Sequence, residues 1–192
     1  MAVTKTHPIK STLKAAIDYI CNPEKTDGKL LVSSYGCAAE TADIEFAWTR
    51  RHAIDKGTNL GRHLIQAFQP GEVTPEQAHE IGCEFARRLF GEDYEVVIGT
   101  HLDKAHPHNH IVVNSVSFAD GKKYHSNAKS YFGEIRKISD EICREYGLSV
   151  IEPQKKGIPY GVLHAEQNGK QTVRSRIRAD IDEIIKVSLN FT

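Results

Sequence analysis

Residues 101–114 read His-Leu-Asp-Lys-Ala-His-Pro-His-Asn-His-Ile-Val-Val-Asn and hold four of the ten histidines of this 192-residue chain. His108 and His110 are two positions apart, and side chains at positions i and i+2 of a β-strand project from the same face. If the stretch ends in a strand, both imidazoles therefore point toward one spot. The pattern predicts a sheet face that carries several ring nitrogens close together.

A hairpin would bring a third histidine to that face. The apolar run over residues 94–100 predicts a strand, and it leads directly into His101. If residues 102–107 form the connection, His101 falls roughly opposite His108, where cross-strand Cβ atoms lie about 5 Å apart. One histidine on a strand is usually structural, but a third at matched spacing favours a metal site with an open position over a merely polar hairpin.

Three polar residues near the histidines are candidates for supporting roles. Asp103 and His106 lie in the predicted connection, where either can orient a ligand, contact a substrate or only decorate the loop. Asn114 shares the face of His108 and His110 by the two-residue period of a strand. A hydrogen bond to a ligand histidine, a phosphate contact and a structural role are all open for this amide.

Composition indicates an ordinary globular domain. Hydrophobic residues make up 40% and charged residues 26% of the chain, and the formal net charge is zero, which gives no bulk support for nucleic-acid binding. We expect no transmembrane helix, because no segment approaches about 18 uninterrupted apolar residues, and the first ten residues lack a signal-peptide core. The four cysteines are scattered and read as reduced thiols. Together these features predict a cytoplasmic protein.

Hydrophobic periodicity and turn residues predict an α+β fold. We expect helices from Ser11 or Thr12 to Ile20, from Thr41 to before Gly57, from the capping box at Thr74 to Gly91, and from Ser126 or Asn127 to Gly147. Strands are expected over residues 62–69, 94–100 and 108–118. This order predicts an antiparallel sheet with helices packed on one face and the histidines on the other.

The chain is expected to divide near residue 150. Residues 1–150 hold the predicted sheet and its helices. Residues 151–192 form an extension that begins as a loop and contains an amphipathic helix over Val173–Val187, a pattern typical of the start of a longer chain.

Several stretches resemble one family. The histidine stretch, followed by Asp-Gly-Lys-Lys-Tyr at residues 120–124, resembles the third motif of MobP-type relaxases, the mobilisation nucleases of plasmids and conjugative elements within the HUH endonucleases. Lys14–Thr26 is similar to their first motif, which holds a nucleophilic tyrosine, and Gln66–Gln77 also recurs in their relaxase domain. The resemblance covers residues 5–150. Asn109 stands where the HUH pattern has a hydrophobic residue, as in many MobP members, and should not disturb the histidine geometry.

The resemblance implies a specific reaction. Relaxases nick one strand of a transfer origin when a tyrosine hydroxyl attacks the scissile phosphate, which leaves a 5′-phosphotyrosine and a free 3′-hydroxyl and can be reversed to religate the strand. The family also implies a divalent ion, Mg²⁺ or Mn²⁺, and we favour Mn²⁺ because three imidazoles bind magnesium poorly. The implied partners are single-stranded origin DNA, accessory mobilisation proteins and a coupling protein.

Tyr19 is the candidate nucleophile. It lies about a right angle away from the centre of the apolar stripe of the first helix, so its ring is expected at the edge of the core with its hydroxyl free. That position alone favours a packing role, and it is the resemblance to the first motif that favours catalysis. Tyr35, in a Ser-Ser-Tyr-Gly stretch expected to be irregular, is the rival.

The candidate DNA contacts are basic side chains and one tyrosine. Cationic side chains are expected against the phosphate backbone and the tyrosine against a base, although plain solvation is equally compatible with each lysine or arginine. The candidates are Arg50, Arg51, Lys122, Lys123, Tyr124 and Lys129.

Two other functional classes remain open from the sequence. One is a metal-dependent nuclease in which the ion bound to His101, His108 and His110 activates water, so that no covalent intermediate forms. The other is a non-catalytic DNA-binding module for replication or mobilisation, in which the histidine hairpin is structural. The role of Tyr19 separates the first from a relaxase, and metal content separates the second.

Overall fold

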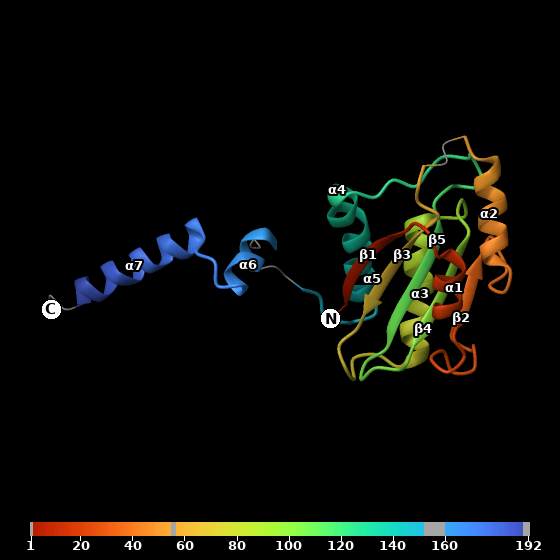
Figure 1. Cartoon of the computed structure of the whole chain (residues 1–192). Coiled ribbons are helices and arrows are strands. Elements are labelled where there is room, and N and C mark those ends of the chain that lie inside the picture. The colour runs from red at the N-terminus through yellow and green to blue at the C-terminus, as the bar shows by residue number, and fades with distance from the viewer. Residues whose placement is uncertain (1, 55–56, 152–159, 190–192) are drawn as a thin grey trace. The chain divides into compact units, whose positions relative to one another are not determined.

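The chain divides into two compact units, Met1–Ile151 and Glu152–Thr192. Figure 1 shows the computed structural model, which describes residues 2–54, 57–151 and 160–189. The described part of the second unit contains α6 (Tyr160–Gln167) and α7 (Val173–Leu189), and α7 matches the helix predicted there. Within the described ranges, no helix has the length and apolar character needed to cross a membrane.

The first unit is built on a five-stranded sheet with the order β1-β3-β5-β4-β2, in which every neighbouring pair is antiparallel. The strands are β1 (Val3–Ile9), β2 (Val32–Tyr35), β3 (Gly61–Ala67), β4 (Val96–His101) and β5 (His108–Asn114). The predicted α+β class with an antiparallel sheet is confirmed. The three central strands were predicted. β4 begins at Val96 rather than at residue 94, and β5 ends at Asn114 rather than at residue 118.

Both edge strands were missed by the sequence prediction. β1 has mostly polar side chains and β2 is only four residues long, so neither shows the apolar run typical of a central strand. The stretch around Tyr35, expected to be irregular, is β2 itself. Its backbone is ordered by pairing with β4, where Tyr35 lies opposite Val96.

Helices pack on both faces of the sheet, whereas the sequence predicted one. The helices of this unit are α1 (Leu13–Ile20), α2 (Ala42–His52), α3 (Pro75–Phe90), α4 (Ala128–Ser130), the π-helical turn η1 (Tyr131–Ile135) and α5 (Arg136–Glu145). One core joins α3 and α5 to Ile98 and Ile111, and a second joins α1 and α2 to Val97 and Val112. The reason is that β4 and β5 carry buried apolar side chains on both faces, so each face requires cover.

Helix ends follow the local sequence signals. Thr74 and Gln77 form the predicted capping box at the start of α3, with Pro75 at the first helical position. Asn127 caps α4, and the predicted long helix is present as the consecutive segments α4, η1 and α5. It stops before Gly147, which adopts φ 70°.

A close backbone contact fixes α1 on the sheet. An added Cβ at Gly99 would lie 2.0 Å from the carbonyl oxygen of Ile20, the last residue of α1. The same carbonyl accepts a hydrogen bond from Nε2 of His101 at 3.2 Å. Glycine in the middle of β4 therefore allows the end of α1 to lie directly beside the histidine face.

We predict that Gly99→Ala destabilises the fold, because the new methyl group must displace the backbone of α1. The expected loss is about 1–3 kcal/mol of unfolding free energy, measured by urea denaturation. Gly133→Ala is the matched control, since no heavy atom lies within 4 Å of the added Cβ. Equal stability of the Gly99→Ala variant and the unchanged chain would contradict the close approach.

Candidate metal centre and tyrosine site

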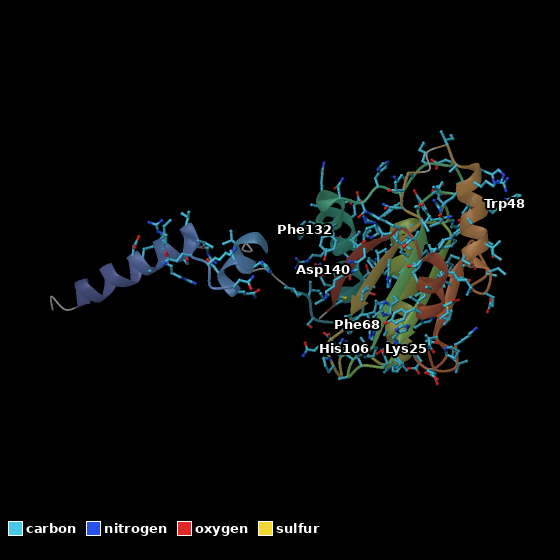
Figure 2. All side chains as sticks on the ribbon, viewed as in Figure 1. Lys25, Trp48, Phe68, His106, Phe132 and Asp140 are labelled. Atoms are coloured by element: carbon cyan, nitrogen blue, oxygen red, sulfur yellow. The ribbon has the colours of Figure 1, made fainter. Side chains whose placement is uncertain are left out.

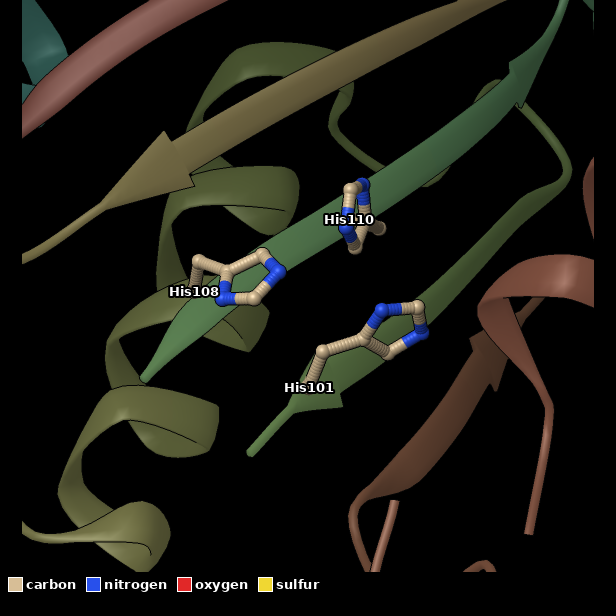
Figure 3. Close-up of side chains that lie close together, drawn as sticks. All are labelled: His101, His108 and His110. Atoms are coloured by element: carbon tan, nitrogen blue, oxygen red, sulfur yellow. The ribbon is translucent and has the colours of Figure 1, made fainter. Parts of the chain in front are cut away.

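Three histidines converge on one face of the β4–β5 hairpin. His101 pairs with His108 across the strands, and Gly99 pairs with His110, which is the register predicted from the spacing. The ring centroids of His101 and His110 are 4.4 Å apart, and those of His108 lie 5.0 Å from His110 and 5.5 Å from His101. One ring nitrogen from each residue lies within 4.8 Å of the others (Figure 3), an arrangement that could hold a metal ion.

Hydrogen bonds orient the rings of His101 and His108. Nε2 of His101 donates to the carbonyl of Ile20 at 3.2 Å, and Nδ1 of His108 donates to the carbonyl of His106 at 3.3 Å. Because a carbonyl only accepts, each of these nitrogens carries the proton of a neutral ring. The lone pairs are then on Nδ1 of His101, which is buried and has no partner among the described residues, and on Nε2 of His108.

The ring of His110 is oriented by a hydrogen bond to His63. Nε2 of His63 lies 2.9 Å from Nδ1 of His110, while Nε2 of His110 is buried and meets no hydrogen-bond partner in the part of the chain that the structure describes. If His110 donates through Nδ1, its Nε2 presents a lone pair to the other two rings. His63 was not predicted from the sequence. Its signal is the pairing of β3 with β5, which places His63 opposite Val112 and hence on the face of His110.

The electrostatics favour neutral rings. Burial lowers the pKa values of His101, His108 and His110, and it lowers the pKa of His63 to about 4. Neutral imidazole is the form that coordinates a metal. Two inward nitrogens without partners and a third lone pair beside them therefore fit a divalent ion that accepts nitrogen ligands.

An ion pair lies at the edge of the histidine cluster. Asp103 is 2.9 Å from Nζ of Lys25 and 3.6 Å from Nε2 of His108. The hydrogen bond from Lys25 holds the pKa of the Asp103 carboxyl below its usual value. Asp103 is thus an ionised group within reach of the site, and its supporting role stays a prediction, whereas Lys25 was not identified from the sequence.

Tyr19 projects from α1 against this cluster. Its ring centroid is 5.0 Å from that of His101 and 5.4 Å from that of His110, and Nζ of Lys25 lies 4.4 Å from the ring centre. The side chain remains 44% exposed. Tyr19 therefore stands between the histidines and solvent.

The rival Tyr35 lies elsewhere. It pairs with Val96 at the far end of β4 from His101. Ser33, two residues earlier in β2, bonds to His79 of α3, so Tyr35 projects from the face opposite the histidines. Burial raises the pKa of Tyr35 to about 12, and the interacting groups include Cys83 and Arg87 of α3.

His106 and Asn114, the other two candidates for supporting roles, lie farther from the histidine cluster. His106 contributes its carbonyl, and its ring centroid is 5.8 Å from that of His108. Asn114 shares the histidine face, but it is six residues along β5, about 20 Å from His108 at roughly 3.3 Å per residue. Its amide donates to Glu95 and to the carbonyl of Phe46 and makes no contact with a ligand candidate.

The residues predicted to contact DNA are distant from the histidines, both in the sequence and along the sheet. Arg50 and Arg51 are in the last turn of α2, and the candidate lysines follow β5 beyond its far end. The ring of Tyr124 packs 5.3 Å from Phe90 and 5.8 Å from Tyr94, which favours a structural role over stacking on a base.

Asn109 has a structural explanation. Its side chain projects to the reverse face, where Oδ1 accepts from Thr100 at 2.7 Å and Nδ2 donates to Gln66 and to the carbonyl of Ala78. A Cβ on Gly82 would lie 2.5 Å from Asn109, so only glycine leaves room there. The polar residue between the paired histidines therefore anchors the hairpin to α3.

Comparison with known proteins agrees with this geometry. The Relaxase family, described as the MobA/VirD2-like nuclease domain, matches residues 19–148, from the candidate nucleophile to the end of the α5 region. The chain belongs to the relaxase family. Two proteins named rlx from Staphylococcus aureus are 36% identical over 187 residues (95% of this chain) and 42% identical over 153 residues (79% of this chain).

The relaxase chain is shorter than these relatives. It spans about half of their length, 53% and 46%. The group II intron-interrupted relaxase LtrB of Lactococcus lactis subsp. cremoris (strain MG1363) is 33% identical over 211 residues, covering 88% of this chain and 37% of LtrB.

Solved structures share the fold at low identity. A chain from a study of vancomycin resistance transfer in Staphylococcus aureus has a TM-score of 0.52 and 18% identity, covering 82% of this chain and 100% of its own length. A Mn-bound MobM relaxase domain in complex with oriT DNA of plasmid pMV158 has a TM-score of 0.53 and 15% identity, covering 93% and 98%. At these identities the likeness shows the relaxase fold alone.

We predict that His63→Phe weakens metal binding by about 10- to 100-fold, because the ring that hydrogen-bonds to Nδ1 of His110 is lost. His63→Gln, whose amide oxygen can accept the same hydrogen bond, is the conservative control and should retain most of the affinity. Calorimetric titration of the chelator-treated protein with Mn²⁺ measures both. Unchanged affinity in His63→Phe would show that His63 does not orient the ligand.

Acid should destabilise the metal-free relaxase domain. An unfolded histidine has a pKa of about 6.5, whereas burial lowers that of His63 to about 4 and lowers those of His101, His108 and His110. Between these values the unfolded chain binds more protons, so the unfolding free energy decreases as the pH falls from about 6.5 toward 4. Each histidine contributes at most about 1.4 kcal/mol per pH unit. A thermal midpoint that stays constant from about pH 7 to pH 5 in chelator would contradict buried neutral rings.

Proposed function

We propose that the chain is the nicking domain of a conjugative relaxase, which cleaves one DNA strand at a transfer origin through Tyr19. The observation that carries the proposal is the placement of the Tyr19 ring 5.0 Å and 5.4 Å from the rings of His101 and His110. Membership of the relaxase family supports it, and so do the two inward histidine nitrogens for which the described residues offer no partner.

His101, His108 and His110 would hold the divalent ion. When bound, such an ion supplies positive charge to the non-bridging oxygens of the scissile phosphate. Mn²⁺ suits three imidazole donors better than Mg²⁺ does, and the related MobM domain is described as Mn-bound. Asp103 and His106 stand in supporting positions, the first as the ionised partner of Lys25 near His108 and the second through the carbonyl that accepts from Nδ1 of His108.

Tyr19 supplies the nucleophile. Its Oη forms a bond to phosphorus as the bond to the 3′-oxygen breaks and the phenol proton is released, which yields a 5′-phosphotyrosine and a free 3′-hydroxyl. The reverse attack by that hydroxyl religates the strand. The ammonium of Lys25, held by Asp103, lies over the ring where negative charge develops during attack.

Basic side chains away from the histidines would contact the phosphate backbone. We assign this role to Arg50, Arg51, Lys122, Lys123 and Lys129, and it implies weaker binding at high salt. We also propose accessory mobilisation proteins and a coupling protein as partners, and the cytoplasm as the place of action, since the substrate would be mobile-element DNA. Asn114 supports the end of β5 and is not assigned to the substrate.

We predict that Tyr19→Phe abolishes the covalent protein–DNA adduct, because it removes the attacking oxygen while the ring and its packing remain. DNA affinity and the unfolding free energy should change little, by less than about 0.5 kcal/mol for the latter, since the side chain is partly exposed. Denaturing gel electrophoresis with single-stranded origin DNA of a related element and Mn²⁺ measures the adduct.

Tyr35→Phe is the matched control and should form adduct at the normal rate. Three outcomes would contradict the proposal. Metal-dependent cleavage that persists in Tyr19→Phe without any adduct would indicate a nuclease that activates water, and an adduct mapped to another residue would displace Tyr19. A protein that binds DNA, but binds no metal and forms no covalent adduct with the nucleotide, would be a non-catalytic binding module.

A further inference from the structure

The only tryptophan of the chain is exposed, which is unusual for so large an apolar side chain. Trp48 lies on α2 with 66% of its surface accessible, and Figure 2 shows it far from the histidine end of the sheet. Two other large apolar residues near it are also accessible, Ile54 at 89% and Phe118 at 47%. Together they form an apolar surface that no described part of the first unit covers.

These residues line a cleft of about 460 Å³ between α2 and the loop that follows β5. Trp48, Thr49 and His52 form the helix wall, and Phe118 and Asp120 belong to the loop wall. The volume falls in the range of about 300–1,000 Å³ that is typical of small-ligand sites. The cleft is therefore large enough for one flat ring system between aromatic walls.

The ring of His52 is tied to the helix wall. Its centroid is 4.6 Å from that of Trp48, and its Nδ1 donates to the carbonyl of Trp48 at 2.8 Å. Because the carbonyl can only accept, Nε2 of the neutral ring is left with a lone pair. The helix wall thus combines an aromatic face with a hydrogen-bond acceptor.

The surroundings of the cleft are cationic. Arg51 is three residues after Trp48, so it shares that side of α2. Lys123 lies against Gly57, which belongs to the connection that follows α2. A Cβ added to Gly57 would overlap with Nζ of Lys123. Asp120 is the one carboxylate among the lining residues, and Lys122 pairs with it at 2.8 Å. Arg51, Lys122 and Lys123 thus set three positive charges against the one carboxylate of the lining.

We infer that this cleft binds an unpaired base of the single-stranded DNA, stacked on Trp48, while Arg51 and Lys123 contact the adjoining phosphates. Apolar aromatic walls bordered by cations are the combination by which proteins hold single strands. The cations favour a polyanion over an apolar protein segment, which would leave them without partners. Asp120 and the lone pair of His52 can accept hydrogen bonds from base amino groups.

The inference rests on the proposed DNA substrate, but the cleft is distinct from the nicking centre. The loop with Phe118 follows β5 at its far end, and β5 alone spans about 20 Å from His108 to Asn114 at roughly 3.3 Å per residue. A strand that reaches the cleft would be gripped well away from the bond that Tyr19 attacks. Base binding should accordingly need neither the metal nor the Tyr19 hydroxyl.

Trp48 is its own probe, because all tryptophan emission of the chain comes from it. We would titrate the full chain, in chelator to prevent cleavage, with a single-stranded oligonucleotide and with an abasic chain of the same length. Stacking should quench the emission with the oligonucleotide only. Trp48→Ala should weaken binding of a labelled oligonucleotide by about tenfold, whereas Phe132→Ala, which removes an exposed aromatic from η1, should not.

Emission that stays constant at saturating oligonucleotide, equal quenching by the abasic chain, or unchanged affinity in Trp48→Ala would each overturn the inference and leave a protein partner as the occupant. The nicking function is judged separately by the Tyr19 adduct. Quenching without an adduct would preserve the base site and refute the relaxase reaction, and an adduct without quenching would do the reverse.

Discussion

The pairing of β4 with β5 is the constraint on which the site depends. With His101 opposite His108, three imidazoles share one face, and a slip of one residue would send those of β5 to the other. The register is held from behind, where Asn109 bonds to Thr100, Gln66 and the carbonyl of Ala78. A buried amide left without these partners would cost about 1–3 kcal/mol, so the polar residue between the histidines specifies the register as well as stabilising it.

The same face carries groups that the protein alone does not satisfy. Nδ1 of His101 and Nε2 of His110 are buried without partners within the described ranges, and burying such nitrogens opposes folding. A bound ion would offset this cost, so metal affinity and stability are linked. The carbonyl of Ile20 links the histidine site to the tyrosine. It accepts the hydrogen bond that orients His101, and it belongs to the last residue of the helix that carries Tyr19.

Local patterns predicted much of this arrangement, and long-range contacts account for what was missed. The two-residue spacing of His108 and His110, the length of the hairpin connection and the capping box at Thr74 are local, and all three were read correctly. The β1 and β2 edges depend on pairing with distant strands. His63 and Lys25 reach the site only through sheet order and a folded loop, so no spacing reveals them.

We propose that His101, His108 and His110 bind one ion beside Tyr19. Anomalous diffraction from crystals of the protein soaked in MnCl₂ tests it most directly. We expect a single strong peak about 2 Å from Nδ1 of His101 and from Nε2 of His108 and His110, on the side that faces the Tyr19 ring. Absence of a peak there, or a peak held by other residues while these three rings stay unliganded, would contradict the account.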